Sequence, residues 1–247
     1  MSKSIEFPGT AGNRYDYSIN NNQDLTGAQT MLIVIRELSG SGSWQSFIES
    51  QTGAAALRPS IGRHVTGDNF YFADSVTTRD NSGVTITSGQ SWQVLAVTRP
   101  GGAGQTVRAH QIIVGGATTR GNFSVTASNE TAYATGKFIV AGDDDPANIR
   151  VAAWAIWDGT ALSDGDIDGI GSALTTQSVL DLSPTSCFDS ENNLMLTDLA
   201  GTLPGTLVGA ITESADGPAG WVYFGEGPAG DSPYRETYIR RSRRTSW

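Results

Sequence analysis

The sequence predicts an all-β fold: an antiparallel β-sandwich (jelly roll) with one short helix and an extended C-terminal arm. Three observations support this prediction. About a dozen short β-type runs alternate with turns rich in Gly, Asn, Asp and Ser. Regularly alternating helix patterns, which a doubly wound α/β protein needs, are missing. A breaker-rich stretch then separates these runs from an Arg-rich end.

Length and composition favour one large globular domain. The chain has 247 residues, and its 38% hydrophobic share together with 30 Gly is ordinary for a globular protein, which excludes disorder of the whole chain. No run approaches the roughly 18 apolar residues of a membrane-spanning helix. The first residues lack the apolar centre of a secretory signal. The single cysteine, Cys187, excludes an intrachain disulfide framework and a cysteine-based zinc site.

The strands of the first half follow from short apolar runs. Thr30–Arg36 is almost continuously apolar, which predicts a central strand buried on both faces. A Thr-Gly-Asp turn predicts a hairpin between its two flanking runs, and Ser-Gly-Gln is a further turn signal. The other predicted strands here are Trp44–Glu49, His64–Val65 with Asn69–Ala73, and Val84–Thr87 and Ser91–Thr98 around Ser-Gly-Gln.

The second half contains the one predicted helix. Ser163 is a suitable N-cap, and Asp166 three residues later completes a capping-box pattern for a helix over 164–174. Ile167, Ile170 and Leu174 lie on one face of that helix. Predicted β-type runs lie on both sides of it: Thr106–Val114, Phe123–Ala127, Lys137–Ala141, Val151–Asp158, Val179–Leu182, Asn193–Leu196, Thr206–Ile211 and Trp221–Phe224.

Charge and composition divide the chain at about Phe224. Residues 1–224 are predicted to form the jelly-roll domain, and residues 225–247 a Gly/Pro linker and an Arg-rich arm. Residues 1–230 carry 11 basic and 23 acidic side chains, a net −12, whereas residues 231–247 carry five Arg and two acidic residues, a net +3. The acidic body argues against nucleic-acid binding.

Three segments resemble laminin-G-like, concanavalin-A-like jelly rolls. Ser91–Arg99 and Thr106–Val114 resemble the central hairpin of that family, although His110 stands where an aromatic residue is more usual. Lys137–Asp143, Val151–Asp158 and Ala161–Ile167 resemble its closing strand and helix start, and Asp198–Gly209 resembles the segment that often follows. The resemblance spans residues 4–224. With no signal peptide and an extended tail, the chain looks most like a minor tail protein of a tailed bacteriophage, which implies a place in the virion.

Catalytic patterns are not found in the sequence. The eight Glu do not form the alternating carboxylate pattern of jelly-roll glucanases. Asp164, Asp166 and Asp168 alternate on the predicted helix, where they point in different directions. The only histidines are His64 and His110, and no nucleophile motif accompanies them. We expect His110 and Cys187 to pack inside the domain, and we expect no enzyme and no obligatory cofactor.

Two groups are candidates for ligand binding. Asp143, Asp144 and Asp145 form the densest acidic cluster, which fits Ca²⁺, although a solvated turn before Pro146 is the interpretation that we favour. Trp44 and Tyr71 are candidates for glycan binding. Tyr71 and Phe72 are adjacent, so only one of them faces outward on a strand, and one of Trp154 and Trp157 is a candidate for an edge or a partner contact.

The C-terminal arm is the strongest candidate for a partner contact. Its Arg side chains suit the carboxylates of an acidic neighbour, its apolar side chains suit pockets, and an extended arm can add to a sheet edge. A disordered solubilising end is the alternative. The sequence therefore favours a virion assembly protein, with homo-oligomers and other virion proteins as partners. A capsid decoration protein and a glycan-binding module remain the alternatives. The docking candidates are Tyr234, Arg235, Tyr238, Ile239, Arg240, Arg241, Arg243, Arg244 and Trp247.

Overall fold

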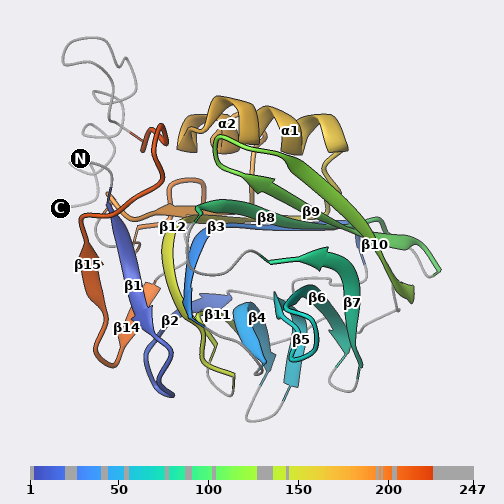
Figure 1. Ribbon diagram of the computed structural model, residues 1–247, viewed down its shortest axis with the longest axis horizontal. Coiled ribbons are helices and arrows are strands. Elements are labelled where there is room, and N and C mark those ends of the chain that lie inside the picture. The colour runs from blue at the N-terminus through green and yellow to red at the C-terminus, as the bar shows by residue number, and fades with distance from the viewer. Residues whose placement is uncertain are drawn as a thin grey trace, which may run out of the picture.

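The computed structural model is an antiparallel sandwich of two β-sheets with two helices against the outer face of one sheet (Figure 1). The prediction of an all-β sandwich consistent with a jelly roll is confirmed. In the described part of the chain, no helix is long and apolar enough to cross a membrane. The structure describes residues 3–19, 27–39, 44–52, 56–75, 78–86, 91–101, 104–126, 136–142, 145–192, 195, 197–201 and 205–224.

The first sheet lies beneath the helices. Its strand order is β10-β9-β8-β3-β12-β1-β15. Strand β13 pairs with the same edge of β12 as β1 does, but at residues 153–156 instead of 148–151. Its strands are β1 (Ser4–Pro8), β3 (Gln29–Ser39), β8 (Gln93–Arg99), β9 (Thr106–Ile113), β10 (Thr118–Thr126), β12 (Asn148–Asp158), β13 (Ser186–Asp189) and β15 (Thr212–Ser214).

The second sheet has the order β14-β2-β11-β4-β5-β6-β7. It packs against the first sheet on the side away from the helices α1 (Asp164–Ala173) and α2 (Thr176–Leu180) (Figure 1). Its strands are β2 (Arg14–Ile19), β4 (Gln45–Thr52), β5 (Ala56–Arg63), β6 (Asn69–Ser75), β7 (Thr78–Thr85), β11 (Gly136–Val140) and β14 (Gly205–Val208).

The first sheet is buried on both faces, as the apolar run in β3 predicts. Ile33 belongs to the core between the sheets, whereas Leu32 belongs to a second apolar cluster under the helices. Trp154 likewise belongs to the core between the sheets and Trp157 to the cluster under the helices, and both are buried. The prediction that one of them reaches an edge or a partner is wrong, because the helices, with Trp221 and Tyr223, cover the outer face of the sheet.

Helix α1 has the predicted boundaries and cap. The Ser163 hydroxyl accepts from the Asp166 N–H while the Asp166 carboxylate accepts from the Ser163 N–H, which forms a capping box. The helix ends at Leu174 in a left-handed conformation. A Cβ at Gly171 would lie 2.3 Å from Ile112 Cδ1, so glycine at this position lets α1 approach β9 closely.

Several local predictions are wrong. The run Val179–Leu182 overlaps helix α2 instead of a strand, because Thr175 caps that helix by accepting from the Ser178 N–H. The strand before the Thr-Gly-Asp turn ends at Arg63, before the predicted His64–Val65. The runs around Ser-Gly-Gln belong to β7 and β8, which lie in different sheets. In Trp221–Phe224, Val222 forms only an isolated bridge to Thr175, and only Met195 of the run 193–196 is described.

The two sides of the sandwich differ. On one side the edge strands β7 and β10 pack together: a Cβ at Gly121 would lie 2.3 Å from the Ser82 carbonyl oxygen. On the other side the edge strands are β14 and β15, which follow each other in the chain and leave Leu207 of β14 45% exposed.

Candidate functional site

Trp44 lies directly before β4 and is a partly exposed aromatic residue, as the glycan prediction requires. Its ring contacts His64 at 4.2 Å between centroids and Tyr71 at 5.4 Å, both edge to face. Of the five tryptophans in the described chain, Trp44 alone is not buried. The site therefore presents one tryptophan that is held in place by two aromatic neighbours.

Tyr71 is buried, so the prediction that it presents a ring to a glycan is wrong. Its hydroxyl is 2.8 Å from the Ser46 hydroxyl, and a Cβ at Gly62 would lie 2.8 Å from its ring carbon Cε1. The ring therefore lies over the glycine of the neighbouring strand. Phe72 faces the core between the sheets, so neither of the two adjacent aromatic residues is exposed. Tyr71 supports Trp44 from below.

Asp145, the described residue of the acidic cluster, lies beside the same end of β4. The Asp145 carbonyl accepts from the Ser46 N–H at 2.9 Å, which places Asp145 near Trp44 and Tyr71. Asp143 and Asp144 lie outside the described residues. Within the described ranges, no group of three or more His, Cys, Asp or Glu side chains is arranged to hold a metal ion. Calcium binding therefore stays a prediction.

A buried ion pair joins the two sheets below this rim. Arg63 of β5 donates to Glu37 of β3 at 2.5 Å and to Asp68, and the side chains of Arg63 and Glu37 are fully buried. Burial raises the pKa of Glu37, whereas the Arg63 guanidinium lowers it. The sequence analysis missed this pair. Alternation along the strand could have revealed it, because Glu37 falls on the same face of β3 as Ile33 and Ile35, which point into the core.

A second charged group lies between α1 and the first sheet. Arg108 donates to both carboxylate oxygens of Asp164, at 2.8 and 2.9 Å, and Arg120 pairs with Asp168. His110 is fully buried beneath them, with Nε2 3.0 Å from the Thr98 hydroxyl. Burial lowers the pKa of His110 to about 4, so the ring is neutral at pH 7. The prediction that His110 packs on a sheet face is confirmed.

Cys187 is also buried as expected. It lies in the cluster under the helices, and burial raises the pKa of its thiol. A thiol with a raised pKa holds little thiolate at neutral pH, so Cys187 is a poor nucleophile.

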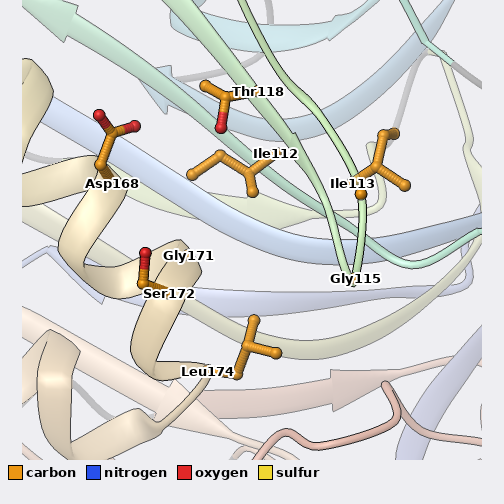
Figure 2. A pocket seen from close by; sticks show the side chains of 9 residues that line it. Ile112, Ile113, Gly115, Thr118, Asp168, Gly171, Ser172 and Leu174 are labelled. Carbon is orange, nitrogen blue, oxygen red and sulfur yellow. The ribbon is translucent and has the colours of Figure 1, made fainter.

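A groove lies between α1 and the turn that joins β9 to β10 (Figure 2). Its volume is about 490 Å³, within the range of roughly 300–1,000 Å³ that ligand pockets occupy. Sequence reasoning missed it because its two walls lie about fifty residues apart and neither carries a motif. We call it the α1 groove; its lining residues are Ile112, Ile113, Gly115, Gly116, Thr118, Asp168, Gly171, Ser172 and Leu174.

Comparison with known proteins supports the fold. No family model and no curated protein matches the chain. A heptameric SAP-like pentraxin from Limulus polyphemus superposes with a TM-score of 0.51 at 12% identity, over 86% of this chain and 94% of that one. This likeness shows the fold alone, a two-sheet antiparallel jelly roll.

Two further solved structures give weaker matches. The extracellular region of zebrafish Gpr126/Adgrg6 matches with a TM-score of 0.47 at 12% identity, over 68% of this chain and 22% of that one. The Trypanosoma rangeli sialidase matches with a TM-score of 0.43 at 7% identity, over 68% and 32%. The likeness to the pentraxin, at 12% identity, supports the fold only, and one fold hosts both binding and structural roles.

The predicted docking residues of the arm, Tyr234 to Trp247, lie outside the described residues. The structure does show how the chain approaches the arm. Trp221 and Tyr223 are buried in the cluster under the helices, and the Phe224 N–H donates to Asp189 at 3.0 Å. The domain is therefore anchored up to the last residue before the linker.

Proposed function

We propose that the chain is a non-enzymatic virion structural protein, a minor tail protein of a tailed bacteriophage, that docks on neighbouring subunits through its C-terminal arm. One observation carries this proposal: an acidic sandwich is followed by fourteen residues with five Arg and three aromatic side chains. Arginine and aromatic residues are the side chains that dominate protein interfaces. A capsid decoration protein of the same fold is the close variant.

The charged groups of the described domain support a role without catalysis. Arg63 with Glu37, and Arg108 with Asp164, join packed elements of the fold. His110 is neutral and buried, and Cys187 is buried with a raised thiol pKa. These groups stabilise the architecture instead of meeting at an accessible reaction centre.

The test compares the full chain with a chain ending at Phe224, by light scattering after size exclusion. This end point keeps the anchors Trp221, Tyr223 and Phe224. We expect a defined oligomer for the full chain and a folded monomer for the shortened one. If both are monomers with equal melting temperatures, assembly through the arm is refuted.

Glycan binding at Trp44 is the second candidate, favoured by a partly exposed ring that two aromatic neighbours support. Stacking of a sugar on an aromatic face needs such a rigid platform. A glycan array would be probed with the native protein, with Trp44→Ala, and with Val222→Ala as a control at another exposed apolar position. We expect binding that Trp44→Ala removes and Val222→Ala leaves unchanged. An array without hits, or hits that survive Trp44→Ala, would exclude this site.

A further inference from the structure

The α1 groove combines an apolar floor with a polar rim. Ile112 is 6% exposed and, with Ile113 and Leu174, supplies the apolar part. Asp168 and Ser172 stand on the helix side, and Thr118 stands on the strand side (Figure 2). Gly115 and Gly116, in the turn, have no side-chain heavy atoms that would fill the groove. Such a surface suits a segment that carries an apolar side chain next to a cation.

Asp168 is the one charged residue among the described residues that line the groove. Arg120 pairs with its Oδ1, and the side chain of Asp168 is 47% exposed. A partly exposed carboxylate can accept a second guanidinium on its other oxygen, since each carboxylate offers about four lone-pair sites. The last turn of α1, which borders the groove, contains no basic residue that would repel a cation.

The end of the described chain passes the groove wall and then leaves it. The Val222 N–H donates to the Leu174 carbonyl at 2.8 Å, and Leu174 lines the groove. Tyr223 then donates to the Lys3 carbonyl, and Phe224 binds Asp189 of β13. The chain thus turns away from its own groove before the linker begins.

We propose that the α1 groove is the seat for the C-terminal arm of a second copy of this chain. A guanidinium of Arg240 or Arg241 binds Asp168, and the side chains of Tyr238 and Ile239 cover the apolar floor. This inference rests on the proposed assembly function and names the surface that receives the arm.

Charge and reach support this occupant. The arm is basic and residues 1–230 are acidic, so the arm of one copy is attracted electrostatically to residues 1–230 of another. The nine linker residues 225–233 reach about 30 Å when extended, which allows the arm to reach a neighbouring molecule. An arm that carries three aromatic residues also gains from a partly apolar seat.

The experiment measures self-association of the full chain by light scattering over a concentration series. Ser172→Trp fills the groove, and Ala173→Trp places the same side chain on the next, exposed helix position, which does not line the groove. We expect Ser172→Trp to weaken association at least tenfold and Ala173→Trp to leave it unchanged. Circular dichroism and melting temperature verify that both variants fold.

A second pair of variants tests charge without added bulk. Asp168→Asn removes the groove carboxylate, whereas Asp181→Asn removes an exposed carboxylate at the C-cap of α2, outside the groove. We expect only Asp168→Asn to weaken association and to flatten its dependence on salt. A labelled peptide of residues 234–247 should compete with assembly of the native chain and fail to bind Ser172→Trp.

The outcomes separate the two proposals. If shortening to Phe224 abolishes assembly while all groove variants assemble normally, the arm docks elsewhere, and the groove inference is overturned while the assembly function stands. If the full chain is monomeric at every concentration, the assembly function fails. If the thiol that Ser172→Cys introduces into that monomer is protected from labelling until the arm is removed, the arm seats in its own groove, and docking between copies is overturned.

Discussion

Arg63 carries a charge at a place from which water is excluded. Its planar guanidinium reaches Glu37 on the opposite sheet and Asp68 in the adjoining turn. Only a side chain with several fixed donors can serve both carboxylates at once. The pair fixes the alignment of β3 and β5 across the core, at the same rim where Trp44 is displayed.

Replacing Arg63 should therefore be costly. Arg63→Met leaves the Glu37 carboxylate buried without its cation, and we expect a loss of about 3–5 kcal/mol in the free energy of unfolding. The double variant Arg63→Met with Glu37→Leu should recover most of that loss, because no charge stays buried. Urea unfolding at pH 7 measures both. A loss below about 1 kcal/mol in the single variant would contradict the view that this pair is energetically coupled.

His110 should make stability depend on pH. Burial lowers the pKa of His110 from 6.5 to about 4. Between pH 6.5 and 4, the imidazole is therefore protonated in the unfolded chain and neutral in the folded one. The contribution of neutral His110 to the free energy of unfolding is therefore fully present above about pH 6.5. It is lost progressively as the pH falls towards 4, by about 3 kcal/mol in total. The groups that face the ring are Asp164, Arg120, Arg108 and Asp168.

The measurement is the free energy of unfolding in urea between pH 7.5 and 4.5, for the native chain and for His110→Gln. Glu37 and Asp189 have raised pKa values and give contributions of the opposite sign, which cancel in the difference between the two proteins. Equal pH profiles for both proteins would show that His110 titrates normally.

At the scale of one element, helix α1 offers a matched pair of glycines. Gly169 has no atom within 4 Å of an added Cβ, whereas at Gly171 the Cβ would lie 2.3 Å from Ile112 Cδ1. Gly169→Ala should stabilise the protein by about 0.5–1 kcal/mol through helix propensity. Gly171→Ala should destabilise it by about 1–3 kcal/mol, because Ile112 must shift. Thermal unfolding of the two variants tests the contrast, and similar shifts for both would refute it.

The elements also show how far sequence reasoning reaches. Continuous apolar runs identified β3, β8 and β12, because a strand buried on both faces leaves that pattern. The capping box located α1 to within one residue at its end. Helix α2 was missed because its five residues are too few for a helical period, and β-branched Val179 favours a strand locally.

Sites were less predictable than elements. Trp44 was found because a tryptophan next to polar residues is visible in sequence. The burial of Tyr71 depends on Gly62 in the neighbouring strand, and the α1 groove depends on how closely α1 approaches β9. Both are set by packing between distant segments, which a pattern along one segment does not encode.

For the whole molecule, the last described segment should decide stability. A chain ending at Phe224 should keep its fold, because it retains the buried side chains of Trp221 and Tyr223. A chain ending at Pro218 lacks the buried side chains of Trp221 and Tyr223, and each such loss costs about 3–5 kcal/mol. Calorimetry on both chains measures the difference. Equal melting temperatures would show that residues 219–224 add nothing to the fold.

The closed contact between β7 and β10 limits how copies of this molecule can grow by strand pairing. A fibre built by adding strand to strand needs subunits that are open on two opposite sides. Here one side is occupied by the molecule's own second sheet, so only the side with β14 and β15 is available. Edge-to-edge pairing is therefore directed to that one side. Growth of a fibre through the sheets has no second, opposite side from which to continue.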